Sequence, residues 1–90
     1  MLVDVREPHE LPRLSKLCGE QDIQLLEIPL SALDNHLEGI SSENIVFVCQ
    51  AGRRSLQAAS LLLKQNVNGS VCSLKGGVQA LVASNLLTYE

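Results

Sequence analysis

Apolar residues in this chain fall into short runs, and the spaces between the runs hold glycine, proline and polar residues. Where β-branched and other apolar residues stand next to one another over a few positions, the pattern predicts strands. Four such runs are present, at residues 2–5, 23–28, 45–49 and 70–74. The run at 45–49 is the clearest, because it combines isoleucine, valine and phenylalanine without interruption.

Helical spacing between and after these strands predicts helices at residues 8–17, 32–37, 55–65 and 78–86, the last of them preceded by a Gly76-Gly77 loop. Pro8 suits the first position of the first helix, and Gly19 suits its end. Ser31 suits the cap of the second helix, with Gly39 as its stop. In the third, one face carries the residues expected to pack on the core: Leu56, Ala59, Leu62 and Leu63. Alternating strands and helices predict an α/β domain with a largely parallel sheet.

Composition narrows the class of protein. With 90 residues the chain is expected to form one domain, and 46% of its residues are hydrophobic, which is ordinary for a globular protein. Its net charge of −3 disfavours a nucleic-acid partner. No apolar run approaches the ~18 residues of a membrane span, and the first residues lack the features of a secretion signal. We therefore expect a cytoplasmic protein with no nucleic-acid or membrane partner.

The three cysteines are Cys18, Cys49 and Cys72, and they are too widely separated for a zinc site or a dithiol motif. Cys18 lies in a helical leucine pattern and Cys72 in a predicted strand, so both are interpreted as inert core residues. Cys49 is different, because it ends a strand just before a Gly/Arg loop and a helix. Backbone N–H groups and the positive end of the helix dipole stabilise an anion at such a position.

Two arginines in this loop, Arg53 and Arg54, add positive charge beside Cys49. Nearby cations and a helix N-terminus both lower the pKa of a thiol. The sequence therefore predicts a reactive thiolate at Cys49. Gly52 is expected to adopt a backbone conformation that other residues resist. Ser55 is expected to cap the helix while its hydroxyl braces the loop. Glu7 and Glu10 are interpreted as charges in the first turn of the first helix.

Three stretches resemble the rhodanese family: Leu2-Val3-Asp4-Val5-Arg6-Glu7-Pro8-His9-Glu10, Ile28-Pro29-Leu30, and Cys49 to Ser55 followed by Lys75-Gly76-Gly77-Val78. They span nearly the whole chain in the family's order. The resemblance implies a three-layer α/β/α fold with a central, largely parallel sheet. It also implies sulfur transfer, in which Cys49 carries a sulfane sulfur as a persulfide and passes it to a nucleophile.

The same resemblance assigns roles to residues around Cys49. Substrate would be bound by the loop that follows it, Gln50, Ala51, Gly52, Arg53, Arg54 and Ser55. Backbone N–H groups of that loop would surround the terminal sulfur, and the two arginines would hold an anionic donor such as thiosulfate. Asp4 and Arg6 would support the loop from the neighbouring strand. No metal is expected, and no cofactor other than the covalent persulfide.

Two alternatives stay open. The related phosphatases have one residue more between their cysteine and arginine, whereas here Gln50 to Arg53 separate Cys49 from Arg54. A tighter ring suits one sulfur atom better than a phosphoryl group, so a phosphatase or arsenate reductase is disfavoured. The fold could also serve as a non-catalytic module that recruits a carrier protein or a desulfurase.

The chain begins on what resembles the family's second strand, which suggests a single domain, residues 1–90, that lacks the first strand and is cut from a longer protein. The opening and the final residues 86–90 resemble the C-terminal rhodanese module of adenylyltransferases of molybdopterin or thiamine biosynthesis. That resemblance implies a ubiquitin-like sulfur carrier as acceptor. It implies thiosulfate or a cysteine desulfurase as donor.

Overall fold

The computed structural model describes residues 1–36, 40, 44–65 and 69–84. A parallel sheet of four strands in the order β2-β1-β3-β4 forms its centre. The strands are β1 Leu2–Asp4, β2 Leu25–Glu27, β3 Asn44–Val48 and β4 Ser70–Ser73. The helices are α1 Ser15–Glu20, the 3₁₀ helix η1 Leu30–Asn35, α2 Arg53–Leu63 and α3 Gly77–Ala83.

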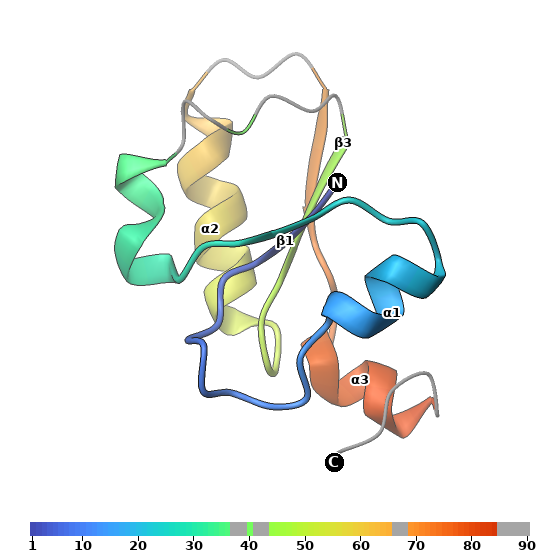
Figure 1. Ribbon diagram of the computed structural model, residues 1–90. Coiled ribbons are helices and arrows are strands. Elements are labelled where there is room, and N and C mark those ends of the chain that lie inside the picture. Colours follow the sequence, from blue (N-terminus) through green and yellow to red (C-terminus); the bar gives the residue numbers. More distant parts are fainter. Residues whose placement is uncertain (37–39, 41–43, 66–68, 85–90) are drawn as a thin grey trace.

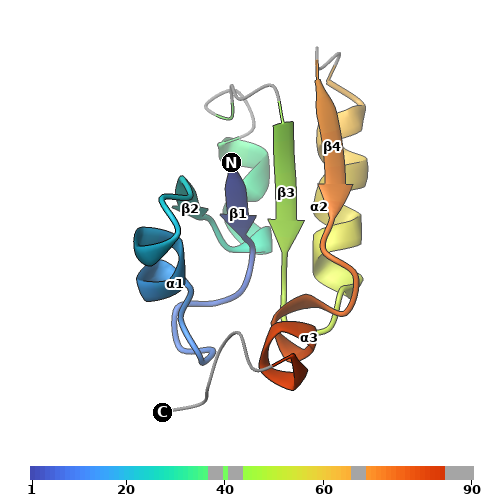
Figure 2. The same cartoon turned by 90° about the vertical axis from the view of Figure 1, so that its right-hand side faces the viewer.

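Helices cover both faces of the sheet. In Figure 1 the sheet is seen on edge, with α2 and η1 on one side and α1 and α3 on the other. Figure 2 shows the strands side by side, with β3 between β1 and β4. The predicted three-layer α/β/α fold with a parallel sheet is confirmed. Within the described residues, no helix combines the length and the apolar character needed to cross a bilayer.

Strand β3 determines which face Cys49 occupies. Side chains alternate along a strand, so Ile45, Phe47 and Cys49 share one face while Val48 belongs to the other. The first three lie in the core cluster that includes Ala58 and other residues of α2. Val48 lies in the second cluster, formed with residues of α1 and α3. Cys49 therefore lies between the sheet and α2, directly after the C-terminal end of β3.

The helix predicted over residues 8–17 is wrong in its position. The chain takes an irregular course up to Leu14, and α1 begins only at Ser15. Pro12 explains this, because a proline inside a helix removes a backbone donor and clashes with the preceding turn. Gly19 lies inside α1 instead of ending it. Glu7 and Glu10 consequently lie in a loop and not in the first turn of a helix.

The packing face predicted for α2 is only half right. Leu62 and Ala59 are buried as expected, but Leu56 and Leu63 are 62% and 57% exposed. The buried residues of α2 are Ser55, Ala58, Ala59 and Leu62, and their i, i+3, i+4, i+7 spacing forms one helical face that leaves Leu56 and Leu63 outside it.

Three smaller expectations also need correction. Cys72 is exposed on the edge strand β4 and is no core residue, whereas Cys18 is buried as expected. The second predicted helix is a 3₁₀ helix that includes Ser31, so that serine does not cap it. Gly39, proposed as its end, and the last residues of the final predicted helix lie outside the described residues.

Candidate active site

The loop after β3 wraps around the sulfur of Cys49. Gly52 has φ 107°, a left-handed conformation that glycine adopts without strain, and it turns the chain directly into α2. The turn points the Gly52 N–H at Cys49, with 3.0 Å between N and Sγ. Cys49 is only 1% exposed, so the sulfur lies beneath the loop.

The thiol of Cys49 has a lowered pKa. Burial, the largest single influence, raises the pKa, but hydrogen bonds together outweigh it. These come from the Ser55 hydroxyl and from the backbone N–H groups of Ser55, Gly52 and Ala51. The sequence predicted a lowered pKa for this cysteine because it precedes a helix N-terminus. The main causes of the lowered pKa are the hydrogen bonds of the loop, more than the charges of the neighbouring arginines.

Ser55 connects the loop to β4. Its Oγ lies 3.4 Å from Cys49 Sγ, 3.2 Å from the carbonyl oxygen of Gly52 and 2.6 Å from Ser73 Oγ. Gly52 is the N-cap residue of α2, so Ser55 does not cap the helix as expected. Its hydroxyl does brace the loop, and it does so directly at the sulfur.

Arg54 pairs with the carboxylate of Glu10, a residue of the N-terminal segment before α1. Its two terminal nitrogens donate to the two oxygens of Glu10 at 2.7 and 2.6 Å. The backbone N–H of Glu7 also donates to Glu10, at 2.6 Å. Hydrogen bonding to Arg54 lowers the pKa of Glu10 to about 2. The pKa of Arg54 is raised, chiefly by Glu10 and also by the nearby charge of Cys49.

Asp4 and Arg6 form a buried ion pair behind the loop. Arg6 Nη2 lies 2.9 Å from Asp4 Oδ2, and both side chains are fully enclosed. Arg6 Nη1 also donates to Gln50 Oε1 at 3.0 Å, so the pair holds the loop residue that follows the cysteine. This geometry is the one expected of supporting residues. Gln50 accepts this hydrogen bond with its side-chain oxygen, and the bond is not its sole interaction.

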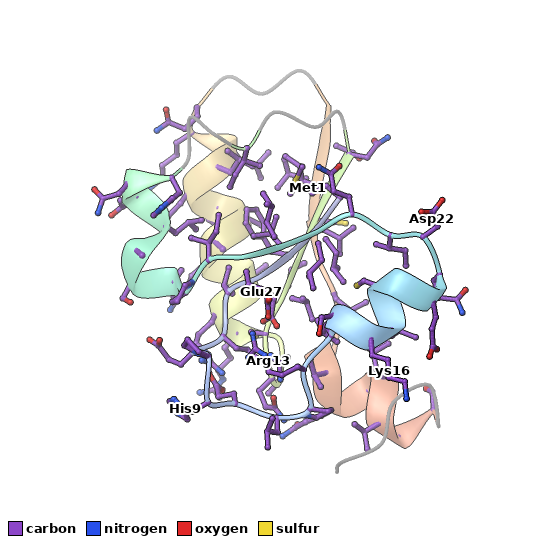
Figure 3. All side chains as sticks on the ribbon, in the orientation of Figure 1. Met1, His9, Arg13, Lys16, Asp22 and Glu27 are labelled. Atoms are coloured by element: carbon purple, nitrogen blue, oxygen red, sulfur yellow. The ribbon has the colours of Figure 1, made fainter. Side chains whose placement is uncertain are left out.

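Arg13 holds the segment before α1 in place. Arg13 Nη1 donates to the carbonyl oxygens of Glu7 and Glu10, and Nη2 pairs with Glu27. Figure 3 shows Arg13 and Glu27 side by side. Glu10 is thus presented to Arg54 by a loop with its own internal bonds.

Gly77 brings α3 against the carbonyl groups of the loop. Val78 N–H donates to Cys49 O at 2.9 Å, and Gln79 N–H donates to Gln50 O at 3.0 Å. A Cβ at Gly77 would lie 2.3 Å from Cys49 O, which no side chain tolerates. The second glycine of the predicted turn therefore allows the close approach of two backbones beside the site.

The six residues predicted to bind substrate form one continuous loop after Cys49, and they differ in how far they are exposed to solvent. Ala51 and Arg53 are exposed, and in the described part of the chain no carboxylate pairs with Arg53. Glu10 and Ser73 were missed as site residues. Glu10 stands in the quoted opening stretch, but nothing in the sequence indicated that Arg54 is its partner. For Ser73 the only signal was its position at the end of a strand beside the cysteine strand.

The described residues include no group of three or more His, Cys, Asp or Glu side chains that could hold a metal ion. Comparison with known families gives a match over residues 1–84 to the rhodanese-like domain. The chain belongs to the rhodanese-like domain family. The predicted resemblance is thereby confirmed. Comparison with curated proteins gives no match.

Solved structures similar to this rhodanese-like domain agree with the assignment. A rhodanese homologue from Thermus thermophilus is 27% identical with a TM-score of 0.67, over 90% of this chain and 82% of that one. The reduced CoADR-RHD of Bacillus anthracis is 32% identical with a TM-score of 0.67, over 87% of this chain and 13% of that one. A NAD-dependent persulfide reductase from A. fulgidus is 32% identical with a TM-score of 0.60, over 86% and 13%.

Proposed function

We propose that this rhodanese-like domain is a sulfurtransferase that carries sulfur on Cys49. One observation carries the proposal: the cysteine with the lowered pKa sits at a strand end with the N–H of Gly52 3.0 Å from its sulfur. A thiolate is the attacking form in sulfur exchange. The other residues expected to bind substrate are Gln50, Ala51, Gly52, Arg53, Arg54 and Ser55, with Asp4 and Arg6 supporting the loop.

The chemistry takes two displacement steps. In the first, Cys49 Sγ attacks the sulfane sulfur of the donor, an Sγ–S bond forms, and the donor's bond to that sulfur breaks with release of its remainder as an anion. In the second, a nucleophilic acceptor attacks the outer sulfur and the Cys49 thiolate leaves. The first step needs no resident base, because the attacking group is the thiolate, the form that the hydrogen bonds of the loop favour. The loop N–H groups suit both the thiolate and the terminal sulfur of the persulfide.

The wider setting is also part of the proposal. Donors of the expected kind are thiosulfate or a cysteine desulfurase, and the expected acceptor is a ubiquitin-like sulfur carrier in the cytoplasm. No cofactor other than the covalent persulfide is invoked. The likeness to a NAD-dependent persulfide reductase from A. fulgidus supports persulfide chemistry as the reaction class. The adenylyltransferase parent stays a prediction from the sequence.

Mass spectrometry tests the proposal. After incubation with a sulfane donor and removal of the excess, we expect the Cys49 peptide to gain ~32 Da, the mass of one sulfur. The Cys49→Ser variant should gain nothing at that peptide, and Cys72→Ser should behave like the wild type. Thiocyanate formed from cyanide would then report transfer to an acceptor. An unmodified Cys49 peptide with a folded protein would contradict the proposal.

A non-catalytic interaction module is the second candidate, and one observation favours it. Cys49 is 1% exposed, which limits access to its sulfur. Such a module would bind its partner without Cys49 ever carrying sulfur. The same mass measurement separates the two functions, because only the transferase forms the persulfide.

A further inference from the structure

The charges around the active loop are arranged in pairs. Arg6 is neutralised by Asp4, and Arg54 by Glu10 through two hydrogen bonds. In the described part of the chain, the remaining cation of the loop is Arg53, which is exposed. The loop therefore offers much less positive charge to a ligand than its two adjacent arginines suggest.

Glu10 is held firmly in this position. The Glu7 N–H donates to the same carboxylate oxygen that Arg54 Nη1 contacts, and Arg13 fixes the carbonyl of Glu10. Only 20% of the Glu10 side chain is exposed. Since Glu10 has a pKa of about 2, it carries its negative charge throughout the neutral range. An anionic donor must therefore approach a thiolate with a second fixed negative charge close by.

The number of charges on the donor then decides how well it binds. Thiosulfate has two negative charges, and to pair with Arg54 it has to compete with a carboxylate that already makes two short hydrogen bonds. A persulfide or a thiosulfonate has a single negative charge. Repulsion from Glu10 is correspondingly smaller for these donors.

Building on the sulfurtransferase function proposed above, we propose that Glu10 is a specificity residue that makes the site prefer singly charged sulfane donors, persulfides and thiosulfonates, over dianionic thiosulfate. The balance of the first step is the same for each donor. With a persulfide anion R–S–S⁻, the Cys49 thiolate bonds to the outer sulfur, RS⁻ leaves and the Cys49 persulfide anion remains. With methanethiosulfonate, methanesulfinate leaves and the Cys49 persulfide anion remains. The sulfane sulfur keeps its oxidation state, and no further reductant or oxidant is needed.

Two donors of nearly the same shape test this directly. Methanethiosulfonate is thiosulfate with one charged oxygen replaced by a methyl group, so the pair differs mainly in charge. With cyanide as acceptor, kcat/KM for thiocyanate formation is measured for both donors in the wild type and in Glu10→Gln. We expect the variant to raise kcat/KM for thiosulfate about tenfold and to change that for methanethiosulfonate less than about threefold.

The control variant is Glu7→Gln. It removes an equal charge from the same segment but leaves the Glu10–Arg54 pair in place, and it should change the ratio of the two rates less than about twofold. A ratio in Glu10→Gln equal to the wild-type ratio would overturn the inference. An equal loss of both activities would also overturn it, since Glu10 would then have only a structural role.

Failure of the underlying function has a different signature. If the wild type forms neither thiocyanate nor a Cys49 persulfide with either donor, the proposed sulfurtransferase itself is contradicted, and the inference falls with it. If the wild type is active with both donors and only the charge preference is missing, the function stands and Glu10 is not its specificity residue.

Discussion

The hydroxyl of Ser55 has one proton and three neighbours that can share it: Cys49 Sγ, Gly52 O and Ser73 Oγ. When the cysteine is a thiol, the proton can go to the carbonyl oxygen of Gly52. When it is a thiolate, the proton is best used at the sulfur, because hydrogen bonds to a charged group are stronger. In both cases the Ser73 hydroxyl can donate to the Ser55 oxygen.

This geometry predicts that Ser55→Ala shifts the acid limb of the kcat/KM profile to higher pH. The variant loses the side-chain hydrogen bond that lowers the pKa of Cys49, so its activity at mildly acidic pH should fall about tenfold. Ser73→Ala should shift the limb in the same direction by a smaller amount, since it acts only through Ser55. Rates of thiocyanate formation across pH measure both effects.

Ser60→Ala is the matched control, because that hydroxyl lies on the exposed side of α2 and donates to the backbone carbonyl oxygen of Leu56. Its profile should coincide with that of the wild type. If Ser55→Ala also coincided with the wild type, the hydroxyl would have no part in stabilising the thiolate.

Single residues differ in how well the sequence predicts them. Cys49 and Gly52 could be predicted because a strand, a cysteine and a glycine stand in one continuous stretch. Glu10 could not, because its partner Arg54 is 44 positions away and the ion pair depends on a loop that the sequence suggested was a helix. Ser73 was missed for a similar reason, since its contact arises from the pairing of β3 with β4.

At the scale of elements, the site depends on the contact between α3 and the end of β3. Donation from Val78 and Gln79 satisfies the carbonyl groups of Cys49 and Gln50. Gly77, with φ 58°, permits that approach. Two helices therefore fix the loop around the sulfur: α2, which continues from it, and α3, which donates to its carbonyl groups.

Gly77→Ala should consequently destabilise the fold by about 2–3 kcal/mol and reduce sulfur transfer. The added Cβ would lie 2.3 Å from Cys49 O, so either the loop or α3 must move. Denaturant unfolding and thiocyanate formation are the two measurements.

Gly19→Ala provides the comparison. Gly19 lies inside α1 with nothing within 4 Å of an added Cβ, so alanine should stabilise the protein by roughly 0.5–1 kcal/mol. Equal stability of Gly77→Ala and the wild type would contradict the proposed contact.

Among the elements, β3 and the start of α3 follow closely from the sequence, because an uninterrupted apolar run and a Gly-Gly pair are local signals. The segment 8–17 shows the limit of local reasoning. Its leucine spacing fits a helix, yet Pro12 and the hydrogen bonds of Arg13 to Glu7 and Glu10 fix an irregular loop. Leu56 and Leu63 likewise have helical spacing but are exposed, because the packing face of α2 is formed by Ser55, Ala58, Ala59 and Leu62.

For the molecule as a whole, the Glu10–Arg54 pair ties the segment before α1 to the N-terminus of α2. The pKa of Glu10 falls from 4.5 to about 2 on folding, so ionised Glu10 stabilises the fold above pH 4.5. That contribution is lost progressively as the pH falls from 4.5 to about 2. Arg54 is partly exposed, which limits the contribution to about 1 kcal/mol.

Glu10→Gln should therefore be less stable than the wild type at neutral pH, and the difference should disappear as the pH falls through this window. Unfolding in denaturant at a series of pH values measures it, with Glu7→Gln as the control of equal charge. A difference that stayed constant down to pH 2 would show that Glu10 acts through packing and not through its charge.

The overall architecture was largely predictable, because strand and helix signals alternate along the chain and parallel strands bring their ends to one edge. The contacts between side chains that meet at that edge of the sheet were less predictable. The family resemblance implied that Asp4 and Arg6 support the loop, but their burial as an ion pair and the bond from Arg6 to Gln50 left no local pattern in the sequence.

The claim on which the account rests is that Cys49 is a thiolate at neutral pH and can be reached by a donor. Alkylation of the folded wild type with iodoacetamide across pH, followed by peptide mass analysis, measures this at Cys49 and at exposed Cys72 in one experiment. We predict that labelling of Cys49 reaches half its maximal rate at a clearly lower pH than labelling of Cys72. Equal pH dependence at the two cysteines, or a Cys49 that never reacts while the protein is folded, would contradict the account.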